Sequence, residues 1–303
     1  MGLIEEILVR PKLRQKLWAW WYPFFTRRVR EQGVDFLNYA FEAADAAALP
    51  LSAADEPNRP NIQLYEHVRG DIALTGLRVL EVSCGHGGGA SYFARTYRPD
   101  EYVGLDLNPE GIRHCQTRHQ VEGLRFQVGD AQRLPFADAS FDLVVCRHVT
   151  QLLPEPERLL AELRRVLKPG GWLHVLSEDY GMLHFPTRNG VDPDRLWHEA
   201  VVPFTQSTGT DARIGRSTLP MLRGLGFTHT SVQYLTIDTE RVPREHLAGI
   251  FTAWRDGYVE ALAAAGRLSR MEVRAMFDAI IDTVSDPQAY GVWHVPVVAG
   301  RCP

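Results

Sequence analysis

The chain of 303 residues is short of cysteine, of long apolar runs and of positive charge, and each shortage excludes something. Its four cysteines lie far apart, at Cys84, Cys115, Cys146 and Cys302. This argues against a disulfide framework and favours reduced, structural thiols. No apolar run approaches the roughly 20 residues that span a membrane. The formal net charge is −4, so nothing suggests a nucleic-acid partner.

Two further absences bear on location and chemistry. No secretory signal peptide opens the sequence, and we therefore expect a cytoplasmic protein. No two histidines stand with acids at the spacing of metal ligands, so we expect no metal site. With 45% apolar residues, the chain can bury one large core, or one core with a cap.

What the sequence does contain is a short apolar run that breaks into glycines, Arg78-Val-Leu-Glu-Val-Ser-Cys-Gly-His-Gly-Gly-Gly-Ala90. Val79, Leu80 and Val82 suit a buried parallel strand. The glycines let the backbone turn sharply and bring its N–H groups against a ligand, and a helix can begin at Ala90. A strand, a glycine loop and a helix are the first unit of a nucleotide-binding α/β sheet, with the ligand at the carboxyl end of the strand.

Two later segments repeat the pattern. The strand expected over 102–108 ends in an acid, Asp106, which stands 21 residues beyond Gly85. In such sheets this carboxylate accepts hydrogen bonds from the two ribose hydroxyls of an adenosine. The strand that starts at Leu124 ends in Asp130 and Ala131. We expect Asp130 to accept from the exocyclic adenine amine and the Ala131 backbone to meet the ring.

The remaining elements complete an α/β fold. We expect strands over 141–146, 172–177, 230–237 and 292–299, helices over 156–167 and 216–225, and a break at Lys168-Pro-Gly-Gly171. Helical patterns over 244–264 and 269–284 precede the last strand, the second opening with the capping box Ser269-Arg-Met-Glu272. We interpret this insertion, together with residues 180–212, as a substrate lid; a surface decoration is the alternative.

The order of these elements predicts a Rossmann-like, seven-stranded sheet, mostly parallel with an antiparallel last strand. We divide the chain into an N-terminal helical extension or cap (1–76), a core (77–239), a helical lid insertion (240–289) and the closing strand (290–303). Residues 10–30 mix aromatic and basic side chains. We expect a helix that packs its aromatic face on the core and closes the pocket, with weak contact to a membrane surface or lipid as the alternative.

Taken together, the signals over residues 77–177 resemble a class I S-adenosylmethionine-dependent methyltransferase. They are Glu81-Val-Ser-Cys-Gly-His-Gly87, Asp106, Gly129-Asp-Ala131, Leu134-Pro-Phe136, Phe141-Asp142 and Leu167-Lys-Pro-Gly-Gly171. Residues 18–120 look like the mycobacterial phthiotriolone and phenolphthiotriolone dimycocerosate O-methyltransferases, in Trp21-Tyr22-Pro23, Asp55-Glu56-Pro57-Asn58-Arg59, the glycine segment and Gly104-Leu-Asp-Leu-Asn108. The resemblance fades after Leu153, and the segment after the fourth strand differs from the Glu-Ala-Ser-His pattern of the lipid enzymes.

The resemblance implies S-adenosylmethionine as the cofactor. The residues it places there are Glu81, Ser83, Gly85, Gly87, Asp106, Leu107, Asn108, Asp130, Ala131 and Arg147. Ser83 stands where most such enzymes have a glycine. Asn38-Tyr-Ala-Phe41 loosely resembles an Asn-x-Gly-Tyr segment whose tyrosine can reach the cofactor carboxylate. Because Phe41 has no hydroxyl, Tyr39 is the substitute we expect to bind there.

The chemistry of methyl transfer narrows the catalytic candidates. A sulfonium methyl needs little activation, so such enzymes mainly align the acceptor and exclude water. A hydroxyl acceptor needs a general base, an amine is often met by carboxylates, and a carboxylate needs cations. His148 follows the fourth strand, and Glu178 and Asp179 follow the fifth. We expect O-methylation of a lipid, polyketide or other natural product, with His148 as the base and the two acids assisting.

Other interpretations stay open. His148 could be a buried, satisfied histidine, and the two acids could cap a turn. The enzyme could methylate a small amine or an amino-acid-derived product. Gly85-x-Gly87-x-x-Ala90 also fits the dinucleotide fingerprint of an NAD-dependent oxidoreductase, but the chain lacks a second nucleotide-binding half and a Tyr-x-x-x-Lys pair. The last alternative is a regulatory protein that binds the cofactor and catalyses no reaction. The acceptor and the oligomeric state, a dimer included, are also open.

Overall fold

A computed structural model describes residues 35–41 and 49–303 of the chain. The expectations for residues 10–30, whether packing on the core or touching lipid, lie outside the described residues. Within the part that is described, no helix is both long enough and apolar enough to cross a bilayer. Cys84, Cys115, Cys146 and Cys302 are all buried, and none of the four forms a disulfide.

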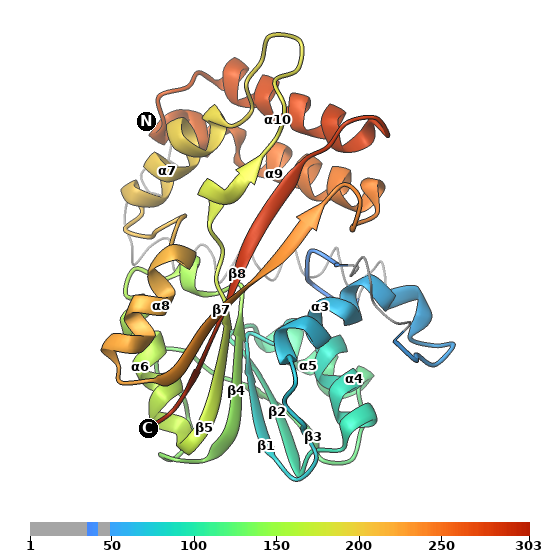
Figure 1. The fold of residues 1–303 in the computed structure, drawn as a ribbon, viewed down its shortest axis with the longest axis vertical. Coiled ribbons are helices and arrows are strands. Elements are labelled where there is room, and N and C mark those ends of the chain that lie inside the picture. Colours follow the sequence, from blue (N-terminus) through green and yellow to red (C-terminus); the bar gives the residue numbers. More distant parts are fainter. Residues whose placement is uncertain (1–34, 42–48) are drawn as a thin grey trace.

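The centre of the fold is an eight-stranded sheet of order β3-β2-β1-β4-β5-β8-β6, with β7 also paired to β8 (Figure 1). The strands are β1 (Arg78–Val82), β2 (Glu101–Asp106), β3 (Leu124–Val128), β4 (Phe141–Arg147), β5 (Leu167–Leu176), β6 (Leu183–His184), β7 (Thr228–Asp238) and β8 (Val292–Arg301). Strands β1 to β5 pair in parallel, and β8 is antiparallel to its neighbours. The predicted Rossmann-like sheet is confirmed. The prediction of seven strands missed β6, which is only two residues long and has no readable alternation.

The described helices are α3 (Arg59–Arg69), α4 (Gly88–Tyr97), α5 (Pro109–Arg118), α6 (Pro156–Val166), α7 (Val202–Ser207), α8 (Gly215–Gly224), α9 (Arg244–Ala265) and α10 (Arg270–Ser285). Single turns lie at Glu56–Asn58, Thr150–Leu152 and Tyr180–Met182, and a π-helical turn at Trp197–Val201. The capping box predicted at Ser269 is present at the start of α10. The break predicted at 168–171, between a helix and the fifth strand, is wrong: β5 already begins at Leu167 and includes these residues, and its register against β4 shifts there.

Strand side chains alternate between two apolar clusters, as they must in a parallel sheet buried on both faces. Val79 and Val145 join the side chains of α3, α4 and α5 on one face. Leu80 and Val144 join those of α6 and α8 on the other. The alternation fixes the sheet between two helical layers and leaves the carboxyl ends of β1 to β5 free to form a site.

Helices α9 and α10 lie beyond those carboxyl ends, beside the upper parts of β7 and β8 (Figure 1). The base of this two-helix insertion is fixed by polar contacts. Asp238, at the end of β7, pairs with Arg241 and accepts a hydrogen bond from the Tyr290 hydroxyl at 3.0 Å. Arg244 donates to the carbonyl of Asp286 at 2.6 Å. The chain positions where α9 begins and α10 ends are therefore tied together. The boundaries at 77, 240 and 290 remain predictions.

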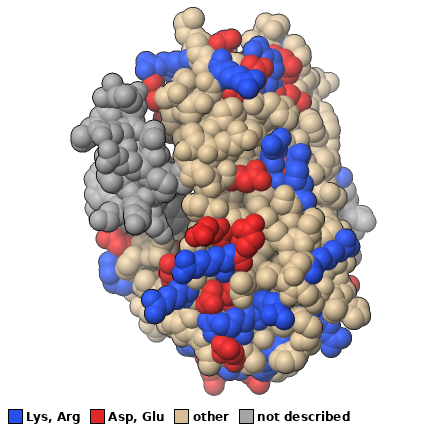
Figure 2. All heavy atoms as spheres, turned by 90° about the vertical axis from the view of Figure 1, so that its left-hand side faces the viewer, with Lys and Arg blue, Asp and Glu red and all other residues tan. Residues whose placement is uncertain are grey.

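On the face that carries α6, α7 and α8, charged side chains of both signs intermingle, with an uncharged band between two groups of them (Figure 2). Helix α6 contributes the ion pair of Arg165 and Glu162 at 2.8 Å. Such partly exposed pairs add little to stability. The face presents a mixed surface rather than an extended patch of one sign.

Candidate active site

The loop after β1 is built from left-handed residues. Ser83, Gly85 and Gly87 have φ of 64°, 57° and 77°. The backbone N–H of Ser83 donates to the Leu105 carbonyl of β2 at 2.7 Å, which fixes the turn. Glycine adopts this conformation without strain. The positive φ of Ser83 therefore explains why most enzymes of the class that the sequence resembles have a glycine at this position, and it shows that this fold accommodates a serine there.

Asp106 lies at the end of β2 and is only 4% exposed. Its Oδ2 accepts from the Gly85 N–H at 3.0 Å and its Oδ1 from the Asn108 N–H at 2.9 Å. Burial raises the pKa of this carboxyl. These two backbone N–H groups hold the Asp106 carboxylate beside the glycine turn. The sequence analysis predicts the cofactor ribose at this place.

Apolar side chains are exposed around Asp106. Leu107 is 57% exposed and Val128, at the end of β3, is 44% exposed. Asp130 is exposed, and its Oδ1 accepts from the Gln132 N–H at 2.9 Å, as a turn residue does. Ala131 is half-buried. A buried acceptor carboxylate next to uncovered apolar faces fits an adenosine, whose ribose donates hydrogen bonds and whose ring stacks.

Beneath the loop, Glu81 and Arg147 form a buried ion pair. The hydroxyls of Tyr65 and Tyr102 donate to the two oxygens of Glu81 at 3.2 and 2.8 Å. The guanidinium of Arg147 also lies 3.6 Å from the centre of the Tyr65 ring. Glu81 is therefore satisfied by the protein, whereas Nη1 of Arg147 is buried without a partner. Of the two predicted cofactor residues, Arg147 has the free hydrogen-bonding group, and it suits an anion such as the cofactor carboxylate.

His148 and Glu178 meet where β4 and β5 end. Nδ1 of His148 lies 2.5 Å from Oε1 of Glu178, and the Tyr39 hydroxyl donates to the same oxygen at 3.3 Å. Glu178 is fully buried and His148 is 20% exposed. Nε2 of His148 and Oε2 of Glu178 are both buried without a partner. Because the carboxylate holds the proton on Nδ1, Nε2 keeps its lone pair, which is what a general base needs.

Asp179 stands next to Glu178 but faces away from the histidine. Its two oxygens accept from Nε and Nη2 of Arg216 at 2.6 and 2.8 Å, and Oδ1 also accepts from the Gly181 N–H at 2.9 Å. The carboxylate is wholly buried. These contacts attach the segment of Asp179 to α8. The structure does not bring Asp179 together with the other two predicted catalytic residues.

Tyr39 lies on the acceptor side of the site. Its ring edge packs on His148, with centroids 4.8 Å apart and planes at 84°. Burial raises the pKa of Tyr39 well above its ordinary value, so the hydroxyl stays protonated and donates to Glu178. The same segment reaches the glycine loop, where the Gly88 N–H donates to the Asp35 carbonyl at 3.1 Å. Contact of Tyr39 with the cofactor remains a prediction.

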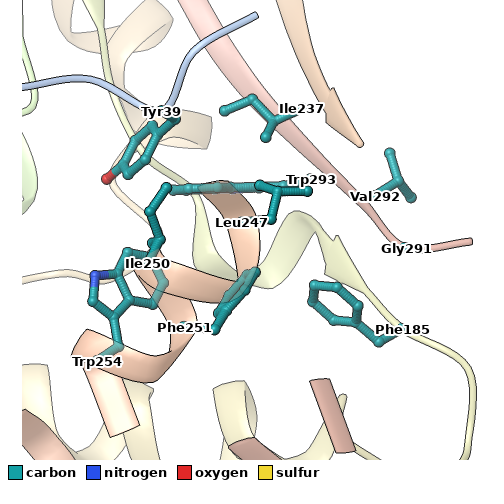
Figure 3. A pocket seen from close by; sticks show the side chains of 10 residues that line it. All are labelled: Tyr39, Phe185, Ile237, Leu247, Ile250, Phe251, Trp254, Gly291, Val292 and Trp293. Carbon is teal, nitrogen blue, oxygen red and sulfur yellow. The ribbon is translucent and has the colours of Figure 1, made fainter. Parts of the chain in front are cut away.

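An aromatic cavity adjoins Tyr39 (Figure 3). It measures about 10 Å³ and is lined by Tyr39, Phe185, Ile237, Leu247, Ile250, Phe251, Trp254, Gly291, Val292 and Trp293. Except for Tyr39, the sequence analysis singled out none of these residues. With Tyr39, the lining residues come from five separate segments, and no local motif marks them. The aromatic spacing of Phe251 and Trp254 on one helical face was the only available signal, and it is shared by ordinary core residues.

Among residues 35–41 and 49–303, no group of three His, Cys, Asp or Glu side chains is arranged to hold a metal ion. His86, from the glycine loop, packs on His114 with ring centroids 5.2 Å apart.

Comparison with known proteins agrees with this geometry. A family model described as a methyltransferase domain matches residues 80–175. The chain is 50% identical over 159 residues to the phthiotriol/phenolphthiotriol dimycocerosates methyltransferase of Mycobacterium leprae, a match over 52% of this chain and 59% of that one. It is 50% identical over 151 residues to the fatty-acid O-methyltransferase of Mycolicibacterium smegmatis, over 50% of this chain and 55% of that one.

The matches therefore span less than two thirds of either relative's length. Among solved structures, the crystal structure of the [4+2]-cyclase SpnF aligns over 97% of both chains with a TM-score of 0.60 and 18% identity, which establishes the fold alone. The matched residues carry β1 to β5 and the cofactor edge. Residues 80–175 thus match a methyltransferase domain, whose cofactor is S-adenosylmethionine.

Proposed function

We propose that the protein transfers a methyl group from S-adenosylmethionine to a hydroxyl oxygen of an apolar small molecule. The observation that carries the proposal is the pairing of His148 with Glu178, which leaves Nε2 of the histidine buried and unpartnered. A hydroxyl must lose its proton as it attacks and therefore needs a base, whereas an ionised carboxylate has no proton to lose and an amine is often met by carboxylates.

The cofactor, when bound, supplies an electrophilic methyl group bonded to sulfur. On this proposal, the Asp106 carboxylate holds its ribose and Leu107 packs on its adenine. Nη1 of Arg147 holds its carboxylate end. The glycine turn places backbone N–H groups between these side chains. Together they bind and orient the cofactor at the carboxyl edge of the sheet.

His148 acts as the general base for the proton of the acceptor hydroxyl. Its Nε2 accepts the proton of the acceptor hydroxyl as the new carbon–oxygen bond forms, and the buried Glu178 carboxylate stabilises the resulting imidazolium. Tyr39 keeps the carboxylate in place by donating to the shared oxygen. Since Glu178 is fully buried, water does not compete for it.

The surroundings of Tyr39, which packs on His148, favour an apolar acceptor. The cavity next to Tyr39 is lined by aromatic and aliphatic side chains and by no charged one. The two relatives compared above are named for action on phthiotriol/phenolphthiotriol dimycocerosates and on fatty acids. A lipid, a polyketide or another natural product with a hydroxyl near an apolar chain meets these conditions.

The direct experiment offers acceptors that differ in one group. 4-Octylphenol, octanoic acid and octylamine are incubated separately with the protein and methyl-labelled S-adenosylmethionine, and products are separated by mass spectrometry. We expect the methyl ether. Asp106→Ala serves as the control, because it should weaken cofactor binding for all three acceptors alike. Product from the amine alone would favour N-methylation, and absence of any product despite cofactor binding would contradict the proposal.

A further inference from the structure

Tyr180 directly follows the two predicted catalytic acids and has no part in the proton transfer described above. It opens a single helical turn, which the Asp179 side chain caps by accepting from the Gly181 N–H at 2.9 Å. The backbone N–H of Tyr180 donates to the Ala212 carbonyl at 2.9 Å. Because Arg216 holds the Asp179 carboxylate, the backbone of Tyr180 is fixed at two points.

The rings of Tyr180 and Tyr39 pack on the same two tryptophans. The ring centroid of Tyr180 lies 5.5 Å from that of Trp293 and 5.8 Å from that of Trp254. The ring centroid of Tyr39 lies 4.8 Å and 6.3 Å from the same two (Figure 3). Trp293 is itself fixed, because its indole N–H donates to the Asp179 carbonyl at 3.1 Å. The two tryptophans therefore hold both tyrosine rings in place.

The hydroxyls of Tyr180 and Tyr39 are hydrogen-bonding partners. A phenol has one proton to donate, and Tyr39 donates its proton to Oε1 of Glu178 at 3.3 Å. In this pair Tyr180 is therefore the donor, and the Tyr39 oxygen is the acceptor. Burial and the negative charge of Glu178 raise the pKa of Tyr180, so its hydroxyl keeps the proton that it donates. The hydrogen bonds thus run from Tyr180 through Tyr39 to the oxygen of Glu178 that also binds His148.

We propose that Tyr180 is a positioning residue for methyl transfer. By donating to Tyr39, it fixes the direction in which the Tyr39 hydroxyl points. Tyr39 in turn holds the Glu178 carboxylate against Nδ1 of His148. Hydrogen bonds that are linked in this way strengthen one another where the surroundings are poor in water. The inference rests on the proposed O-methylation, in which His148 is the base, and it makes Tyr180 act only through Tyr39.

The test removes the two hydroxyls singly and together and keeps the rings, in Tyr39→Phe, Tyr180→Phe and the double variant. With 4-octylphenol as acceptor, Tyr180→Phe should lower kcat about 2- to 10-fold, because one hydrogen bond contributes that much. The KM for S-adenosylmethionine should not change. The double variant should have the kcat of Tyr39→Phe, since Tyr180 then has no hydroxyl to act on. Tyr97→Phe is the matched control: Tyr97 is also partly buried, and its hydroxyl donates to Glu66 at 2.7 Å, outside the site.

Proton NMR of the His148 Nδ1–H, recorded without cofactor or acceptor, separates this inference from the function on which it rests. His148→Ala identifies the resonance by its loss. Tyr39→Phe should shift the resonance, Tyr180→Phe should shift it in the same direction by less, and the double variant should match Tyr39→Phe. This pattern supports the positioning role even where no phenol is methylated. A Tyr180→Phe protein with the wild-type resonance and kcat overturns the inference and leaves O-methylation standing. An effect of Tyr180→Phe that is undiminished in the Tyr39→Phe background also overturns it.

Discussion

His148 reaches Glu178 from a left-handed backbone conformation. Its φ is 58°, and its Nδ1 lies 2.5 Å from Oε1 of the glutamate. A residue with a Cβ pays about 1–3 kcal/mol to stay in such a region. Its backbone N–H donates to the Leu176 carbonyl at 3.3 Å, which extends the pairing of β4 and β5 and holds the turn. The strain sits at the residue that we assign as the base, as is common at functional sites.

The first prediction concerns the ribose site. Asp106→Ala should lower the affinity for S-adenosylhomocysteine by roughly 30- to 1,000-fold, because two hydrogen bonds to a charged acceptor are worth about 2–4 kcal/mol. Calorimetry measures it, with Ser269→Ala as the control. That variant removes the cap of α10, whose side chain accepts from the Glu272 N–H, and should mainly lower stability. NAD should not bind the wild-type protein. Unchanged affinity in Asp106→Ala would assign the ribose to another residue.

The pH dependence of binding follows from the same carboxyl. Burial raises the pKa of Asp106, and the ribose hydroxyls need the ionised form as acceptor. Affinity for S-adenosylhomocysteine should therefore be full above the raised pKa. It should fall as the pH drops through that pKa, starting at a higher pH than an ordinary aspartate near about 3.9 would cause. Asp106→Ala should lack this step. A wild-type affinity that stays level from about pH 7 to pH 4 would contradict it.

The local part of the site was predictable and the assembled part was not. The strand, the glycine turn and Asp106 lie within thirty residues of one another, and period and spacing place them at one sheet edge. His148 and Glu178 follow strands that turn out to be neighbours, so parallel pairing of β4 with β5 brings them together. Their separate positions were predicted; the direct hydrogen bond depends on side-chain geometry that a sequence does not carry.

Other features depend on long-range packing. Asp179 directly follows Glu178 in the segment after β5, but its side chain binds Arg216 of α8 instead of His148. The aromatic cavity joins residues from the N-terminal segment, α9 and β8, and no spacing rule links them. The π-helical turn at Trp197–Val201 likewise has no sequence signature.

The buried ion pair gives a prediction on stability. Arg147→Met leaves Glu81 buried without its cation and should lower the free energy of unfolding by about 3–5 kcal/mol. Arg78→Met removes a partly exposed partner of Glu101 and should cost no more than about 1 kcal/mol. Chemical denaturation of both variants measures the difference. Equal losses in the two variants would show that the buried Glu81–Arg147 pair stabilises the fold no more than a partly exposed pair does.

Asp179 and Glu178 can be separated by paired variants. Asp179→Asn weakens the contact with Arg216 and should lower the melting temperature while kcat of the folded protein changes little. Glu178→Gln removes the charge behind His148 and should lower kcat at least tenfold with cofactor affinity preserved. Thermal unfolding and steady-state kinetics are measured on both. A larger loss of kcat in Asp179→Asn would restore that residue as a catalytic candidate.

The most direct test of the account is single-turnover methyl transfer to a hydroxyl acceptor by the wild type and by His148→Ala, with S-adenosylhomocysteine affinity measured on the same samples. Removal of a general base should lower the rate by roughly 10²- to 10⁴-fold and leave the affinity unchanged, because His148 contacts Glu178 and Tyr39 rather than the ribose site. A His148→Ala protein that methylates the hydroxyl at the wild-type rate would contradict the assignment of His148 as the base.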